Sequence, residues 1–216
     1  MKKKIISILV GATVLLSMEV IGCSTNKKSS TKKESYSVTQ EEIDSAKSKF
    51  SEDLNACEFM IDGEVYSYPM TPNDLITKGG WEFKKEQISN IKTVPNNSVT
   101  NAIQMYKGEK QTLSITVGNF SGETLNLENC NIGTVTLSNS CKSKIIMPKG
   151  ITIGSTIDEV TEAYGSAEDE KCEYGIDRTY ELTCSDGTSV DLALRFNVKT
   201  KKLETINYRY DLRENR

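Results

Sequence analysis

The sequence predicts an α+β protein made of two related units, each with a short helix packed on an antiparallel sheet. Short runs alternate between apolar and polar side chains, which is the period of strands with one buried face. Asp62-Gly63 and Asp186-Gly187 each separate two such runs, as in tight hairpins. Two segments between the runs, beginning near Thr71 and Thr156, carry helix-capping signals.

The first 22 residues have the form of a secretory signal peptide. Lys2–Lys4 precede the apolar run Ile5–Met18, which is shorter than the roughly 20 residues of a membrane span. Val20–Cys23 follows and resembles the lipobox of bacterial lipoproteins, in which the cysteine is diacylated and becomes the mature N-terminus. The resemblance implies that residues 1–22 are removed. It also implies that Cys23 carries a diacylglyceryl group and palmitate, which anchor the chain to the extracytoplasmic face of the cell membrane.

A tether and a helix are expected next. Residues 23–38 contain almost no apolar side chain, so they cannot bury enough surface to offset the entropy of ordering, and we expect a flexible tether. Thr39 followed by Glu42 predicts a capping box. The apolar residues after it lie at helical spacing, at Ile43, Ala46, Phe50 and Leu54. We therefore expect one helix within residues 39–56, running from about Gln40 to Leu54.

The first α+β unit is expected over residues 57–148. Thr71 is the predicted N-cap of a short helix with Pro72 at its first position, and Gly79-Gly80 is its predicted end. Antiparallel strands with one buried face follow. Their inward side chains are expected to be Ile103 and Met105, then Leu113, Ile115 and Val117, then Leu125 and Leu127, and finally Val135 and Leu137.

The second α+β unit is expected over residues 149–216, and its pattern restarts that of the first. Thr156 is the predicted cap, with Glu159 three residues later and Gly165 as terminator. A shift of 85 residues carries Thr71, Asp74, Leu75 and Gly80 onto Thr156, Glu159, Val160 and Gly165. One offset shared by a cap, an acid, an apolar residue and a glycine suggests a duplicated unit.

The strand register around Asp186-Gly187 follows from side-chain polarity. A two-residue loop places Leu182 opposite Asp191, whereas a three-residue loop places Leu182 opposite Val190. The three-residue loop also puts Gly187 at the left-handed position that such loops require. We therefore expect the three-residue loop, with Tyr180 opposite Leu192. Leu194, Phe196, Ile206, Tyr208 and Tyr210 are expected to continue the buried face.

The segment "IGSTIDEVTEAYG", followed by strands that end in "KLETINYRYD", resembles the helix-plus-meander unit of SmpA/OmlA-like lipoproteins. It is similar, too, to the tandem units of β-lactamase-inhibitor-protein-like domains. The resemblance covers residues 150–211 well and residues 57–140 loosely. It implies a non-catalytic protein that binds other proteins through a sheet face or its edges.

The polar side of the second sheet is the candidate binding face. Its residues share the strand parity opposite the core, and they are Thr179, Glu181, Asp191, Arg195, Asn207 and Arg209. With the helix covering the other side, this face is expected to be open and to carry charges of both signs. An ordinary solvated face is the alternative interpretation.

Five cysteines remain besides Cys23, at positions 57, 130, 141, 172 and 184. Buried free thiols and at least one disulfide are both open interpretations. Cys130–Cys141 is the expected pair if a bridge forms, because the segment between them could bring them close. Cys184 shares the parity of Tyr180 and Leu182, which favours a place in the core. The absence of a C-x-x-C pair argues against a zinc site.

Composition narrows the function further. The chain has no histidine, which excludes Ser-His and Cys-His nucleophile pairs and histidine general bases. Its formal net charge of −3 argues against a nucleic-acid partner. No cofactor or metal motif is present. The sequence therefore predicts a non-enzymatic, lipid-anchored binding or scaffolding lipoprotein of the cell envelope, with the membrane and an unidentified protein as partners. The alternatives are an inhibitor of a secreted hydrolase and an enzyme that uses carboxylates or a cysteine.

Overall fold

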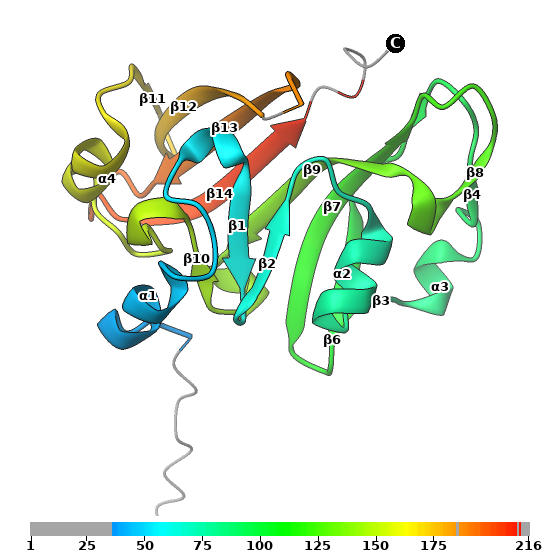
Figure 1. Cartoon of the computed structure of the whole chain (residues 1–216), viewed down its shortest axis with the longest axis horizontal. Coiled ribbons are helices and arrows are strands. Elements are labelled where there is room, and N and C mark those ends of the chain that lie inside the picture. The colour runs from blue at the N-terminus through cyan, green and yellow to red at the C-terminus, as the bar shows by residue number, and fades with distance from the viewer. Residues whose placement is uncertain (1–35, 185, 211, 213–216) are drawn as a thin grey trace, which may run out of the picture. The chain divides into compact units, whose positions relative to one another are not determined.

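The computed structural model describes residues 36–184, 186–210 and 212, which belong to one compact unit. The predicted signal peptide, Cys23 and nearly all of the tether lie outside the described residues. The fold is α+β, as predicted, with mostly antiparallel strands and few helices (Figure 1).

Nine strands of the described residues form one sheet, called the large sheet here. They are β3 (Glu82–Phe83), β5 (Ser98–Val99), β6 (Ile103–Lys107), β7 (Gln111–Asn119), β9 (Asn131–Ser138), β11 (Asp169–Cys172), β12 (Gly175–Thr183), β13 (Ser189–Phe196) and β14 (Leu203–Tyr210). Their order is β11-β12-β13-β14-β9-β7-β6-β3, and β5 also pairs with β7. The pairing of β14 with β9 joins the strands of the two predicted units in one surface.

The remaining elements are shorter. A small sheet has the order β10-β1-β2, and β4 pairs separately with β8. Their bounds are β1 (Glu58–Ile61), β2 (Glu64–Ser67), β4 (Thr93–Val94), β8 (Leu125–Asn126) and β10 (Ile145–Ile146). The α-helices are α1 (Gln40–Ala46), α2 (Pro72–Gly79), α3 (Lys85–Ile88) and α4 (Ile157–Tyr164). The 3₁₀ helices are η1 (Leu54–Ala56), η2 (Leu127–Asn129), η3 (Asn139–Cys141) and η4 (Pro148–Gly150).

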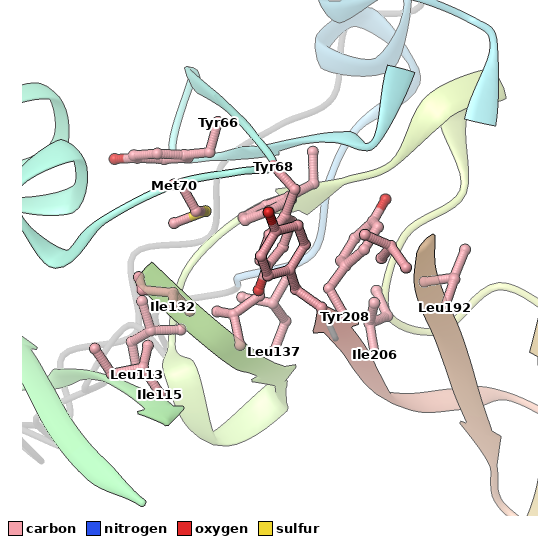
Figure 2. Packing of buried hydrophobic residues seen from close by; sticks show 14 of the residues in the cluster. Tyr66, Tyr68, Met70, Leu113, Ile115, Ile132, Leu137, Leu192, Ile206 and Tyr208 are labelled. Atoms are coloured by element: carbon pink, nitrogen blue, oxygen red, sulfur yellow. The ribbon is translucent and has the colours of Figure 1, made fainter. Parts of the chain in front are cut away.

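The main core lies between one face of the large sheet and a layer made of the small sheet, α2 and α4. Figure 2 shows Tyr68 lying next to Tyr208 and Leu137 of the large sheet, and the rings of Tyr68 and Tyr208 are 5.8 Å apart. Tyr208 is fully buried, and its hydroxyl donates a hydrogen bond to the carbonyl of Glu58 at 3.0 Å. Its ring stacks on Phe59 at 5.2 Å. Aromatic rings therefore fill the centre of the core.

The helix predicted over residues 39–56 is shorter than expected. Its capping box is confirmed, because the Thr39 amide donates to Glu42 Oε2 at 2.9 Å. However, α1 ends at Ala46 instead of continuing to Leu54. Ala46 and Phe50 pack on the outer side of the small sheet, whereas Leu54 packs in the main core. The chain must turn between Phe50 and Leu54 to reach two different cores, so their helical spacing was coincidental.

The predicted hairpins and registers are confirmed. Asp62 and Gly63 form a two-residue loop with φ values of 51° and 90°, between the paired residues Ile61 and Glu64. In the second unit, Leu182 pairs with Val190 and Tyr180 with Leu192, as the three-residue loop requires. Gly187 has a φ of 87° there, in the left-handed region that favours glycine.

The two predicted cap-to-glycine helices are also confirmed. A shift of 85 residues carries the bounds of α2 onto those of α4. Each begins with a capping box, at Thr71 and at Thr156. Leu75 and Val160, which correspond under this shift, are both fully buried.

One predicted strand takes a different place. Leu125 and Leu127 were expected to lie in the main antiparallel sheet, but β8 pairs only with β4. Leu125 pairs with Val94 there, and Leu127 begins the 3₁₀ helix η2. The amide of Leu127 donates to the carbonyl of Lys92, so Lys92 and the adjoining strand β4 supply the partner that the alternating pattern could not identify.

The predicted cysteine pairing is wrong. Cys57 bonds to Cys184, with a Cα–Cα distance of 5.8 Å, whereas Cys130 and Cys141 are buried free thiols. The reason is geometric. The eight-residue strand β9 lies between Cys130 and Cys141. An extended strand of that length spans about 26 Å, far beyond the roughly 7 Å limit for a disulfide.

Candidate binding surface

The face of the large sheet opposite the core is called the open face here. It carries the outward side chains of the six long strands. Its central part consists of Gln104 on β6; Ser114 and Thr116 on β7; Thr134 and Thr136 on β9; Asp177, Thr179 and Glu181 on β12; Asp191, Ala193 and Arg195 on β13; and Thr205, Asn207 and Arg209 on β14. All but Ala193 are polar, and all but Ala193 are half-buried or exposed.

The structure places all six residues of the predicted binding face on this surface. Strand pairing sets Asp191 between Glu181 and Arg209, so these three form one row. Asn207 lies one row away, opposite Ala193. The candidate residues are therefore neighbours in space, as their shared parity predicted.

The sequence did not predict that the open face continues into the first unit. Asn207 pairs with Thr136 across the β14–β9 junction, and Thr136 Oγ1 lies 2.8 Å from Asn207 Oδ1. One row then crosses six strands, through Thr179, Ala193, Asn207, Thr136, Ser114 and Gln104. The polar positions of the runs near residues 104–136 carried this signal. The sequence did not reveal the pairing of β14 with β9, which joins the two polar faces into one.

The centre of the open face is uncharged, and charged rows flank it. In one row, Arg195 Nε and Nη2 donate to the two carboxylate oxygens of Asp177 at 2.7 and 2.6 Å. These hydrogen bonds lower the pKa of Asp177 and raise that of Arg195. In the other flanking row, Glu181 lies directly opposite Asp191. Like charges in that position repel each other. Arg209 lies opposite Asp191 on its other side, so the row has one negative charge in excess, which favours a ligand that brings a cation beside Glu181.

A hollow of about 610 Å³ lies at this second charged row. Its polar lining includes Glu181, Asp191 and Arg209, and its apolar lining includes Val99, Phe120 and Leu212. Val99 is 57% exposed, which is unusual for a large apolar side chain in a strand. The hollow thus combines carboxylates, a guanidinium group and apolar surface on the open face.

A second polar hollow, of about 490 Å³, lies beside the edge strand β11 and is lined by Glu168, Asp169, Glu170 and Asp177. Two of its acids are already paired, since Asp169 accepts from Arg178 Nε at 2.8 Å and Asp177 binds Arg195. In the described part of the chain, no group of three or more His, Cys, Asp or Glu side chains is placed to hold a metal ion.

Comparisons with known proteins add no assignment. No family model matches the chain, and neither the curated proteins nor the solved structures contain a match. Within the described residues, no helix has the length and apolar character to cross a membrane.

Proposed function

We propose that this protein is a lipid-anchored, extracytoplasmic lipoprotein that binds or scaffolds a protein partner and catalyses no reaction itself. The open face is the observation that supports this function. It is a continuous polar surface across six strands, and the small sheet, α2 and α4 all pack on the opposite face of the large sheet. Diacylglyceryl-Cys23 is the proposed membrane anchor.

The dimensions of the open face suit a protein partner. Five of the six strands have eight or nine residues and β6 has five, so at about 4.8 Å between strands the face spans roughly 24 by 26 Å. That area approaches the approximately 800 Å² that each partner buries in a standard interface. Threonine, serine and asparagine side chains are short, so ordering them on binding costs little rotamer entropy. The open face is therefore a pre-ordered surface of suitable size.

We also propose that the two halves of the large sheet are a duplicated unit. In each half a capped eight-residue helix is followed by three long strands, and the last strand lies innermost. β9 and β14 are these last strands, and they pair antiparallel. The equal helix bounds under a shift of 85 residues support the same origin.

The anchor limits where a partner can be. Residues 24–35 separate Cys23 from the described chain, and 12 residues span at most roughly 43 Å even when fully extended. A partner held on the open face therefore lies in the membrane or close to it. Cys23→Ala is expected to release the protein from the membrane fraction while its circular dichroism spectrum stays the same. Retention of Cys23→Ala in the membrane would overturn the anchor.

Binding is tested separately, with the lipidated protein as bait in membranes. Asn207→Arg places a long cation in the uncharged centre of the open face and is expected to abolish capture of the partner. Asn90→Arg is the matched control, since Asn90 is exposed and lies in the turn after α3, away from the open face. If both variants capture the same protein as the wild type, the open face is not the binding surface.

The alternative function is inhibition of a secreted hydrolase. The resemblance to inhibitor-type tandem units favours it, as does a pre-ordered face that a disulfide supports. It requires inhibition of at least one secreted hydrolase at sub-micromolar protein. A panel of such enzymes without any inhibition would dismiss it and leave the scaffolding function standing.

A further inference from the structure

Leu212 lies on the open face, although it follows the last strand of the large sheet. It is 8% exposed and lines the hollow described above. Beneath it are Gly118 of β7 and Gly133 of β9, both buried. A Cβ atom on Gly118 would lie 2.3 Å from Leu212 Cδ1, and one on Gly133 would lie 2.7 Å from it. The two glycines thus form the floor of a recess that holds one aliphatic side chain.

The backbone does not require glycine at either position. Neither Gly118 nor Gly133 has a positive φ, in contrast to eight other glycines among the described residues. The consequence of glycine here is therefore space, because a methyl group at either position would enter the volume that Leu212 occupies. Phe120 and Val99 extend this apolar surface at the edge of the recess.

We propose that this recess is a docking site for one aliphatic side chain of an extended segment of the partner protein. In the free protein Leu212 occupies the recess, and the partner displaces it. This inference rests on the proposed function, because it identifies the part of the open face that holds the partner most specifically. Leu212 acts as an internal copy of the ligand.

The charges around the recess indicate which residue accompanies the aliphatic one. Glu181, Asp191 and Arg209 form one row in the same hollow, so the row carries two acids and one base and has an excess negative charge. Glu181 lies on the side of Asp191 away from Arg209 and forms no ion pair with another described residue. β13 is two strands away from β9, about 10 Å, which a lysine or arginine beside the aliphatic residue can reach. The preferred segment therefore carries an aliphatic residue next to a basic one. The chain itself has this combination at Leu212-Arg213.

The test uses a labelled peptide with the sequence of residues 210–216, YDLRENR, and measures its binding by fluorescence anisotropy. The full mature chain carries Cys23→Ala so that it stays in solution. Leu212→Ala empties the recess and removes the internal competitor, so the peptide is expected to bind at least about tenfold more tightly than to the wild type. A peptide with alanine in place of its leucine is expected not to bind.

Variants that fill the recess are expected to weaken peptide binding, in contrast to Leu212→Ala. Gly118→Ala, added to Leu212→Ala, places a methyl group in the recess and is expected to abolish peptide binding. Gly133→Ala added to Leu212→Ala repeats this test from the neighbouring strand, and a thermal unfolding curve verifies that each variant is folded. Val198→Ala truncates an exposed apolar side chain elsewhere and should bind the peptide as the wild type does.

The inference is overturned if Leu212→Ala binds the peptide no more tightly than the wild type. It is also overturned if the folded glycine variants bind as well as Leu212→Ala does. Neither result affects the membrane-release experiment or the Asn207→Arg capture experiment, because the peptide assay contains no membrane and does not involve Asn207. Failure of the recess and failure of the proposed function are therefore distinguishable.

Discussion

Cys57 and Cys184 are 127 residues apart in the sequence and form a disulfide bond. Cys57 directly precedes β1 of the small sheet, and Cys184 directly follows β12 of the large sheet. Asn55 adds a second link, since its Oδ1 accepts from the amide of Thr183 at 3.1 Å. The start of β1 is thus linked to the end of β12.

Removing this disulfide is expected to destabilise the protein. Cys57→Ser and Cys184→Ser, singly or together, should each lower the free energy of unfolding by about 2–5 kcal/mol, because a long loop in the unfolded chain is no longer closed. Urea unfolding followed by circular dichroism measures the change. Cys172→Ser is the control, since Cys172 is an exposed free thiol, and it should leave stability unchanged. If the two single variants and the double variant are all as stable as Cys172→Ser, the disulfide does not contribute to stability.

Gly79 is expected to tolerate no side chain. A Cβ atom at this position would lie 2.1 Å from Tyr66 Oη and 2.7 Å from Trp81 Cδ1, and both residues are buried. Gly79→Ala should therefore cost about 1–3 kcal/mol of unfolding free energy through overpacking. Tyr66→Phe in the same chain removes the closest atom and should restore part of the loss. Thr77→Ala, on the exposed side of α2, is the control. If Tyr66→Phe does not restore any of the unfolding free energy that Gly79→Ala removes, the clash with Tyr66 is not the cause of the loss.

Two arginines of β12 and β13 are expected to differ in their contribution to stability. The side chain of Arg178 is 6% exposed and donates to Asp169 and to Thr161 Oγ1, the latter at 2.7 Å. Arg178→Ala leaves these groups without their donor and should cost about 1–3 kcal/mol. The side chain of Arg195 is 50% exposed, so Arg195→Ala should cost less than about 1 kcal/mol despite its two hydrogen bonds to Asp177. Chemical unfolding of the two variants compares them, and equal losses would contradict the argument.

The buried tyrosines predict a loss of stability at alkaline pH. Burial raises the pKa of Tyr66 to about 12, and it raises the pKa values of Tyr68, Tyr164 and Tyr208 well above the ordinary value of 10. The unfolded chain then releases these protons at a lower pH than the folded chain does. Their stabilising contribution is complete below pH 10 and is lost as the pH rises through the folded pKa values.

At pH 11 Tyr66 should contribute about 1 kcal/mol less than at pH 9, and the other three buried tyrosines should lose stabilisation in the same direction. Absorbance of tyrosinate near 295 nm, together with urea unfolding at both pH values, measures the effect. Titration of all tyrosines with a normal pKa in the folded protein would rule the prediction out.

The candidate site could be predicted only in part. Alternation along the second unit identified Thr179, Asp191 and Asn207 as residues of one face, because strand parity is a local property. The other half of the open face required the β14–β9 junction, which no local pattern encodes. The recess under Leu212 required, in addition, the path of the chain after β14.

The sequence by itself determined the local features of the fold. The Asp62-Gly63 and Gly187 turns, the capped helices α2 and α4, and the register of Leu182 with Val190 all follow from backbone conformations and alternation within a few residues. Only the tertiary structure decided which distant segments meet. Contacts between residues far apart in the sequence determine three features: the Cys57–Cys184 bond, the end of α1 at Ala46 and the position of Leu212 over Gly118 and Gly133. Such contacts form where packing of the whole domain brings distant segments together, so the local sequence pattern around each residue does not predict them.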